Sequence, residues 1–407
     1  MTDVQEPGLE PIDDWATQFD HTRPEYAAHA PEIWSDLRQR CPIAHSDAFG
    51  GTYLPTRHED VKAIAHDTHN YTSQGVIVSP FKPDVPRPMG YAPPITSDPP
   101  FHAEARRLLL PPFGPKKIAQ LEPFTREFCN HLIDEMVADG ADVVDAATQY
   151  AQHIPVRIIA HMLGLPPEDG DLFRGFIHRI VETPGAEEAI DPQDTLDAYL
   201  TRKIIEHREN PKTGDDADLI DFLVAARMAG QPLADEHIFG TIALLLIAGI
   251  DTTWSAIGAS LWHLAQHPQD RRRFIEDPDV RPFAVEEFLR LYAPVTMARL
   301  VAEDHELSGC PMQEGQWLLL PFPAANRDPE IFENPDEFVI DRVENRHAAF
   351  GLGIHRCLGS NLARLELSVA IETWLERIPE FELADPEGVR WSTGQIRGPR
   401  LLPVRIG

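Results

Sequence analysis

The sequence predicts a mainly α-helical domain with a minor β component. Apolar residues recur at three- and four-residue spacing in successive segments between residues 117 and 292, which is typical of amphipathic helices. Residues 234–266 have a centre that is apolar all round, as expected for a buried helix. Short strand-like segments follow within residues 300–320. No linker divides the pattern, so we expect one domain over residues 25–407 after an irregular acidic lead-in over residues 1–24.

The elements follow in order from the apolar periodicity and from the turn-forming residues between segments. The stretch 72–100 holds eight prolines and few helix formers, so it reads as a long loop, and long loops inside compact domains are commonly functional. Strands are expected over 51–54, within 300–320 and after 379. Helices are expected over 27–40, 57–66, 117–138, 145–164, 168–181, 192–208, 216–229, 234–266, 280–292 and 358–378.

Composition excludes several classes of protein. The 407 residues include 65 Asp plus Glu against 36 Lys plus Arg, a net charge of −29, which disfavours nucleic-acid binding. Apolar residues make up 43% and charged residues 25%, as in ordinary globular proteins. The four cysteines are widely separated, so neither a disulfide scaffold nor a zinc ribbon is indicated, and a reduced compartment fits best. They are Cys41, Cys129, Cys310 and Cys357.

The chain shows no targeting or membrane-spanning pattern. Residues Met1–Pro7 lack the basic and apolar regions of a secretory signal. The longest apolar stretch, Ile238–Ile250, falls short of the roughly 20 residues needed to cross a bilayer. We therefore expect a cytoplasmic protein without membrane association, and a monomer by default.

The strongest functional signal is the ten-residue segment Phe350–Gly359, in which three glycines surround Cys357 just before a predicted helix. Glycine lets the backbone pass close to a bulky, flat group and tolerates positive φ. A helix N-terminus lowers the pKa of a nearby thiol, so Cys357 is suited to be a thiolate ligand of iron. The alternative is a buried structural cysteine in a glycine-rich loop.

Phe350–Gly359 resembles the heme-binding loop of the cytochrome P450 family. Three further segments appear in that family's order: Asp98–Arg106 resembles its propionate-binding helix start, Ala248–Thr253 its oxygen-activation segment and Glu287–Arg290 its structural Glu-x-x-Arg motif. The resemblance covers residues 30–405 and is to soluble bacterial members. It implies a cytochrome P450 fold, with a long central helix over the heme and a small β-rich region. The implied cofactor is heme b, iron protoporphyrin IX.

The expected heme contacts have a physical basis in this sequence. Heme brings two carboxylates into an apolar pocket, where buried anions need charged donors. His102 and Arg106 are four residues apart and share a helix face, although solvated surface charges are the alternative. The resemblance makes Cys357 the metal ligand. It places these residues at the cofactor: His102, Arg106, Ala248, Arg299, Phe350, Gly351, His355, Cys357 and Gly359.

Asp251 and Thr252 interrupt the apolar face of the long helix and are the expected catalytic residues. The small Ala248 and Gly249 just before them leave room for a diatomic ligand. The threonine hydroxyl would hold a water or the distal oxygen, and the aspartate would relay protons from solvent. The alternative is a pair that bonds only the local backbone.

Glu287 and Arg290 lie three apart on one helix and can face one another. The resemblance adds Arg342 as a third member, and the expected role of all three is structural: they fix the chain that leads to Cys357. A zinc site at His347, His355 and Cys357 is disfavoured because no fourth ligand stands at a standard spacing.

Ten mostly apolar residues are placed near the substrate by the resemblance, although several of them would serve equally well as core. Their apolar character indicates a small hydrophobic substrate, and hydroxylation and oxidative dealkylation both stay open. These residues are Val76, Ile77, Val78, Phe81, Leu244, Leu245, Ala248, Val295, Met297 and Ile396.

The resemblance implies a monooxygenase that inserts one atom of O2 into its substrate. No nucleotide-binding glycine motif follows a predicted strand, so electrons are expected from an iron–sulfur ferredoxin with its NAD(P)H-dependent reductase. Two alternatives are a peroxide-driven peroxygenase and a non-catalytic heme sensor or carrier. A docking patch for an acidic ferredoxin is hypothesised on the outward-facing members of one cationic set, with Arg106 reserved for heme. The set is Arg106, Arg107, Lys116, Lys117, Arg346, Arg356 and Arg364.

Overall fold

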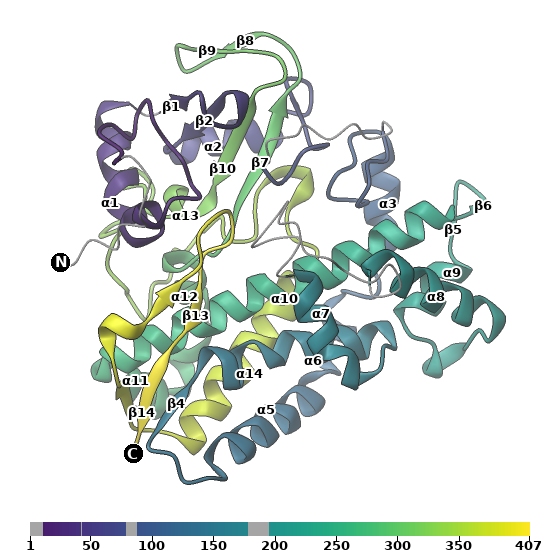
Figure 1. Cartoon of the computed structure of the whole chain (residues 1–407), viewed down its shortest axis with the longest axis vertical. Helices are drawn as coiled ribbons and strands as arrows, with labels where there is room; N and C mark the ends of the chain where they lie inside the picture. The colour runs from purple at the N-terminus through teal and green to yellow at the C-terminus, as the bar shows by residue number, and fades with distance from the viewer. Residues whose placement is uncertain (1–10, 42, 79–87, 178–194) are drawn as a thin grey trace.

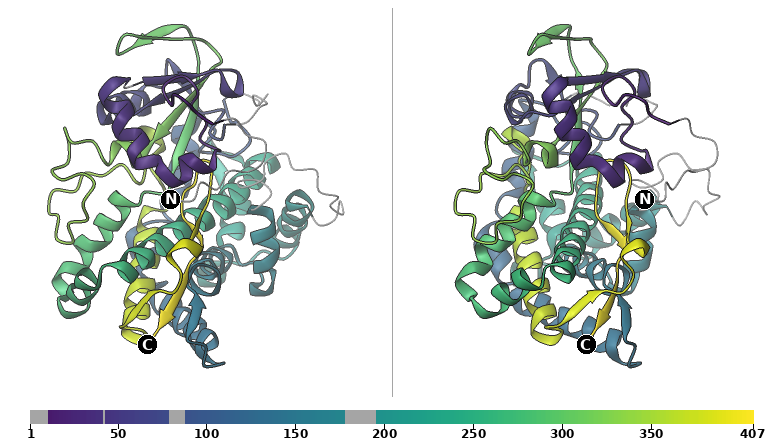
Figure 2. Two further views of the ribbon diagram at one scale, coloured as in Figure 1. Left: turned by 60° about the vertical axis from the view of Figure 1, so that its left-hand side comes forward. Right: turned by 90° about the vertical axis from the view of Figure 1, so that its left-hand side faces the viewer.

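The structure is a computed structural model that describes residues 11–41, 43–78, 88–177 and 195–407. The long helix α10 (Asp235–Gln266) crosses the centre of the molecule. A β-rich part lies at one end, and helices α5, α6 and α14 lie at the other (Figures 1 and 2). The mainly α-helical prediction with a small β-rich region is confirmed.

The helices follow the apolar periodicity closely. Several of them begin with proline in the first turn, where its missing N–H costs no hydrogen bond. The remaining helices are α1 (Pro24–Arg40), α2 (His58–His66), α3 (Phe101–Leu109), α4 (Pro115–Ala119), α5 (Glu122–Val137), α6 (His153–Leu163), α7 (Gly170–Ile177), α8 (Leu196–Glu209), α9 (Leu219–Ala225), α11 (Pro268–Glu276), α12 (Arg281–Leu291), α13 (Phe322–Ala325) and α14 (Ser360–Arg377).

The largest described sheet has five strands in the order β1-β2-β10-β7-β3. Its central strands β10 (Trp317–Pro321) and β7 (Thr296–Val301) are antiparallel, with Leu318 opposite Arg299. The flanking strands are β1 (Ile43–Ser46), β2 (Thr52–Pro55) and β3 (Tyr71–Thr72). A three-stranded sheet joins β11 (Phe381–Leu383), β14 (Pro403–Ile406) and β4 (Val143–Asp145). Two-stranded pairs are β12 (Arg390–Trp391) with β13 (Pro399–Leu401), β5 (Arg227–Met228) with β6 (Gln231–Pro232), and β8 (His305–Leu307) with β9 (Cys310–Met312).

Three predicted helices differ from the structure. The segment 145–164 starts at the last residue of β4, is π-helical over Ala147–Ala151 and becomes the α-helix α6 at His153. The segment 117–138 is divided into α4 and α5 at Gln120–Leu121. The segment 216–229 ends as helix at Ala225, and the chain turns back as the β5–β6 hairpin. Ala229 and Gly230 both take positive φ there, as a tight hairpin turn requires. The ends of the predicted helices 168–181 and 192–208 that fall within 178–194 lie outside the described residues.

Helix α10 is buried because it packs against α6, α8 and α14 in the main apolar core. A Cβ on Gly249 would lie 3.4 Å from Ile159 of α6, so a small residue lets the two helices approach closely. By length and composition, α10 is the one described helix apolar enough to cross a membrane, but 67% of its most apolar window is buried inside the protein. In this protein α10 is therefore a core helix.

Helix α14 carries a buried acid that no predicted role includes. Glu366 is 1% exposed, and its Oε2 has no hydrogen-bond partner among the described residues. Burial raises the pKa of Glu366 well above its ordinary value, because the charged form is poorly solvated there. The folded protein therefore holds this carboxyl in its neutral form.

Glu366→Gln tests this assignment. The unfolded carboxyl titrates near pH 4.3 and the folded one much higher, so wild-type stability falls by about 1.4 kcal/mol per pH unit above that value. Glutamine does not titrate, so we expect the stability advantage of Glu366→Gln to grow as the pH rises above the unfolded value, measured by urea unfolding. Glu376→Gln on the exposed face of α14 is the control. A pH-independent difference between wild type and Glu366→Gln would contradict the assignment.

Candidate functional site

The Cys357 loop is shaped by its glycines. Cys357 lies two residues before Gly359, the N-cap of α14, and its amide donates to the carbonyl oxygen of Phe350 at 2.6 Å. Gly353 has φ +68°, and a Cβ there would lie 2.0 Å from the carbonyl oxygen of Ala65 in α2. Glycine is thus required for the loop to pass this close to α2.

Cys357 and Ala248 are both solvent-accessible, although Ala248 lies in the middle of the buried helix α10. Burial nevertheless raises the pKa of the Cys357 thiol above its ordinary value. The predicted lowering of the Cys357 pKa is therefore wrong for the chain alone. The Gly359 amide and the nearby guanidinium of Arg106 favour the thiolate, but burial outweighs them.

A cluster of cationic and imidazole groups lies next to this loop. The rings of His102 and His355 meet edge to face, with centroids 4.3 Å apart. His355 Nε2 is 2.8 Å from the hydroxyl of Ser73. Arg299, 5% exposed, donates to its neighbouring carbonyl at Ala298 at 2.7 Å. The structure thus brings together three of the predicted propionate-binding residues, which are distant in sequence.

The fourth, Arg106, extends from α3 to the same loop and donates to the carbonyl oxygen of Arg356. It also lowers the pKa values of His102 and His355, which places its charge beside theirs. The cluster therefore joins α3, β7 and the Cys357 loop.

The cluster carries more positive charge than negative. Burial and then Arg299 lower the pKa of His355 to about 2, and burial and then Arg106 lower that of His102 to about 4. Burial also lowers the pKa of Arg299 to about 10. Among the described residues, Asp98 is the carboxylate that offsets the charge at His102 and Arg299.

Asp98 is itself committed to other donors. Its oxygens accept from Thr72 Oγ1 at 2.5 Å and from the Ser73 amide at 2.9 Å. His102 Nε2 is buried without a hydrogen-bond partner in the described chain. The unpaired His102 nitrogen and the excess positive charge suit an anionic ligand, so these residues fit the two carboxylates of a heme.

Asp251 and Thr252 lie on α10 near Ala248. The Thr252 hydroxyl donates to the Ala248 carbonyl oxygen at 2.8 Å, so the local backbone bond left open by the sequence is present. Asp251 is fully buried, and Arg400 Nη2 donates to its Oδ1 at 2.6 Å. Arg400 also donates to Ser255 Oγ at 3.0 Å. Arg400 was not predicted from the sequence. The one indication of it is that a buried carboxylate such as Asp251 requires a nearby cation.

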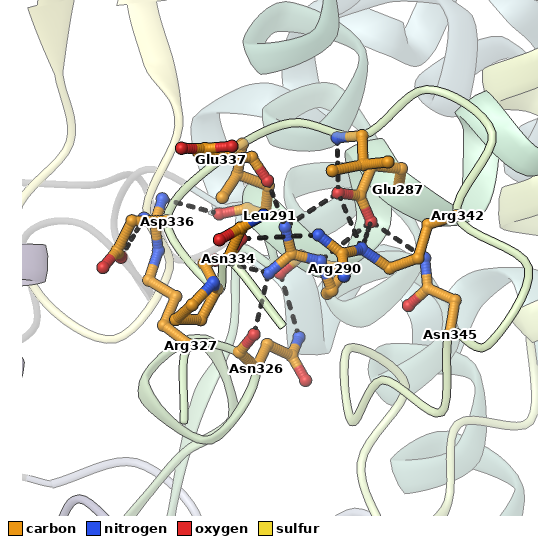
Figure 3. A network of polar contacts seen from close by, with 12 residues as sticks. Glu287, Arg290, Leu291, Asn326, Arg327, Asn334, Asp336, Glu337, Arg342 and Asn345 are labelled. Atoms are coloured by element: carbon orange, nitrogen blue, oxygen red, sulfur yellow. Dashed lines mark hydrogen bonds and ion pairs between the residues drawn. The ribbon is translucent and has the colours of Figure 1, made fainter. Parts of the chain in front are cut away.

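The predicted structural motif forms a buried ion network (Figure 3). Glu287 and Arg290 are both 0% exposed and share two hydrogen bonds of 2.8 Å. Arg342 Nε lies 3.1 Å from both Glu287 oxygens, as the resemblance implied. Arg290 Nη1 donates to the carbonyl oxygen of Asn326, whose own side chain accepts from the Ala348 amide at 2.6 Å. The network thus reaches the chain two residues before Phe350.

A second ion pair anchors the same segment and was not predicted. Arg364 donates to both oxygens of Glu286, at 2.5 and 2.8 Å, and its guanidinium lies 4.5 Å from the Phe350 ring centroid. His347 Nε2 lies 3.0 Å from the same carboxylate. Burial alone would raise the pKa of Glu286, but Arg364 and His347 lower it to about 2. Arg364 therefore has a structural role that was not predicted, and with a side chain 32% exposed it is not among the outward-facing members of the cationic set.

The expected pocket residues differ in their neighbours and in their burial. Val76, Val295 and Ile396 come together, since Val295 and Ile396 form an antiparallel bridge and Val76 binds the amide of the β7 residue Ala298. Leu245 and Val78 instead belong to buried apolar clusters, so they also serve as core. Phe81 lies outside the described residues. The half-buried members, which keep accessible surface, are Ile77, Leu244, Val295, Met297 and Ile396.

Comparison with known proteins agrees with this geometry. The family model "Cytochrome P450" matches residues 170–280 and 282–392. The chain belongs to the cytochrome P450 family. It is 34% identical over 359 residues to mycinamicin IV hydroxylase/epoxidase of Micromonospora griseorubida, covering 86% of this chain and 89% of that protein. It is 37% identical over 330 residues to vitamin D(3) 25-hydroxylase of Pseudonocardia autotrophica, covering 80% and 79%.

Solved structures show the same fold for this cytochrome P450. The Bacillus subtilis polyketide synthase cytochrome P450 PksS superposes with a TM-score of 0.83 at 29% identity, covering 96% of this chain and 100% of that one. The relatives named as hydroxylases and oxygenases make the chain a monooxygenase of the oxidoreductase class. The cofactor implied by the family is a heme iron.

Glu287→Gln tests the network that anchors the heme loop of this cytochrome P450. The substitution keeps shape but leaves two guanidinium groups without their carboxylate, so we expect a loss of about 3–5 kcal/mol in the free energy of unfolding. Urea unfolding measures it. Glu337→Gln is the matched control, because only its main-chain carbonyl joins the network and its side chain is exposed. Equal stability of both variants would contradict the role of Glu287.

Proposed function

We propose that this cytochrome P450 is a heme-thiolate monooxygenase that inserts one atom of O2 into a small hydrophobic substrate in the cytoplasm. The observation that carries the proposal is the accessible Cys357, just ahead of α14, beside a cluster that has excess positive charge and a buried His102 nitrogen without a partner in the described chain. Cys357 would hold the iron of heme b. The carboxylates of the heme would be held by His102, Arg106, Arg299 and His355.

A heme with a thiolate ligand supplies dioxygen activation, and the thiolate favours O–O cleavage. Iron charge also stabilises a thiolate that burial otherwise disfavours. The chain supplies the proton path. Thr252 places a hydroxyl on the accessible side of α10, and Asp251 provides a carboxylate one residue before it. Arg400 holds that carboxylate in place. Because Arg400 is itself partly exposed, it connects the buried acid to solvent.

Hydroxylation is favoured over dealkylation by the relatives named as hydroxylases. Half-buried apolar side chains at Ile77, Val295, Met297 and Ile396 support a hydrophobic substrate. These side chains would bind a substrate by burying its apolar surface rather than by pairing with a charge.

For electron supply we propose an iron–sulfur ferredoxin with its NAD(P)H-dependent reductase. Five cationic residues of the hypothesised patch are exposed, which an acidic partner requires. The docking patch is therefore reduced to Arg107, Lys116, Lys117, Arg346 and Arg356.

Cys357→His tests the thiolate. The reduced wild-type protein with carbon monoxide should show a strongly red-shifted Soret band, because a thiolate donates more electron density than imidazole. Cys357→His should lose that band while keeping bound heme. Cys310→His, at a half-buried cysteine of the β9 strand, should keep it. A wild-type protein that binds no heme when it is supplied would overturn the proposal.

Thr252→Ala separates the proposal from its two alternatives. With a ferredoxin and its reductase present, the variant should consume electrons without matching product, because proton delivery is mispositioned. Thr252→Ser, which keeps the hydroxyl, should restore coupling. A peroxide-driven enzyme would lose little in Thr252→Ala, and a sensor or carrier would make no product in either form.

A further inference from the structure

Three backbone segments that carry expected pocket residues meet at Gln395. The Thr296 amide donates to the Gln395 carbonyl oxygen at 2.8 Å, and the Arg397 amide donates to Pro294 at 2.8 Å. The Ala298 amide donates to the Val76 carbonyl oxygen at 3.0 Å. The start of β7 thus lies between the turn 392–397 on one side and residues 76–78 on the other.

The Gln395 side chain adds a direct link between these segments. Its Oε1 accepts from the Val78 amide at 2.5 Å, while its Nε2 donates to the Val76 carbonyl at 3.2 Å and to the Thr296 carbonyl at 2.9 Å. One carboxamide therefore binds both β7 and residues 76–78. All three partners are backbone groups, so apart from proline at position 78, which would remove the amide, no substitution at a partner residue removes them.

The turn that contains Gln395 has its own hydrogen bonds. Ser392 Oγ donates to the Ile396 carbonyl oxygen at 2.7 Å and accepts from the Gly398 amide at 3.0 Å. Gly394 takes φ +85°, as the turn requires. Since Ser392 and the backbone pairing with β7 already fix the turn, the Gln395 side chain serves mainly to hold residues 76–78.

We propose that Gln395 is a positioning residue that determines the shape of the substrate pocket. It fixes the backbone of residues 76–78, whose half-buried side chain is Ile77, beside the segments that carry Val295, Met297 and Ile396. The inference rests on the proposed function, because that function makes these side chains a pocket. Only a side chain with one acceptor and two donors at this length satisfies the three backbone groups.

The consequence is selectivity between large and small ligands. A small ligand that binds only at the iron does not contact residues 76–78 or 396. A bulky apolar ligand reaches them and benefits from walls that are already in place. Loss of the Gln395 bonds therefore weakens binding of the bulky ligand alone.

Optical titration of the heme-loaded protein with imidazole and with clotrimazole tests this. In Gln395→Leu and Gln395→Glu, the ratio of clotrimazole to imidazole affinity should fall about fivefold, the effect of losing roughly one net hydrogen bond. Glutamate keeps the length but loses both donors. Gln313→Leu, at an exposed glutamine, is the matched control and should leave the ratio unchanged. An unchanged or raised ratio in both Gln395 variants overturns the inference.

Hydrogen exchange provides a test that needs no heme. The Val78 amide should exchange about fivefold faster in Gln395→Leu than in wild type, while the paired amides of β7 stay protected. Equal exchange at Val78 would show that Gln395 does not hold this segment. Failure to bind heme would overturn the proposed function, but the exchange result would still decide whether Gln395 positions residues 76–78.

Discussion

One buried carboxylate fixes the chain that leads to Cys357. Glu287 holds the guanidinium groups of Arg290, which is fully buried, and of Arg342, whose side chain is mostly buried. Arg290 in turn binds the carbonyl oxygens of Asn326, Pro335 and Glu337, so three parts of an otherwise irregular segment converge on one side chain. A segment with few helices or strands has little backbone pairing of its own. The ion network supplies that order. Removing one member leaves buried charges without a partner, which is strongly destabilising.

Two ion pairs anchor the Cys357 loop, one on each side of the cysteine. The Glu287 network fixes the chain up to Ala348, whereas Glu286 fixes α14 through Arg364 beyond Cys357. Consecutive glutamates on α12 thus anchor the loop at both ends. The Arg364 guanidinium over the Phe350 ring closes the loop on itself. Anchoring on both sides restricts the position of Cys357, as its proposed role as metal ligand requires.

Contacts at short spacing could be predicted from the residues themselves, whereas the long-range contacts that were predicted, such as that of Arg342 with Glu287, came from the family resemblance. His102 with Arg106, Glu287 with Arg290, and the ten residues around Cys357 are each local, so their faces follow from helix or loop geometry. Arg400 is 149 residues from Asp251, and Glu286 is 78 residues from Arg364. No periodicity joins such residues, because their contact depends on the packing of distant elements. The β5–β6 hairpin was missed for a local reason: positive φ at Ala229 competes with a helical apolar pattern.

The C-terminal segment joins the two halves of the site. Gly398 passes so close to α10 that a Cβ there would lie 2.3 Å from Ser255 Cβ, and this approach brings Arg400 to the carboxylate of Asp251. Three residues earlier, Gln395 binds residues 76–78 and β7. One stretch of fewer than ten residues therefore contacts both the acid expected to move protons and the wall expected to contact substrate. A displacement of this stretch would move the Asp251 contact and the substrate wall together, because the chain at Gly398 is packed directly against α10.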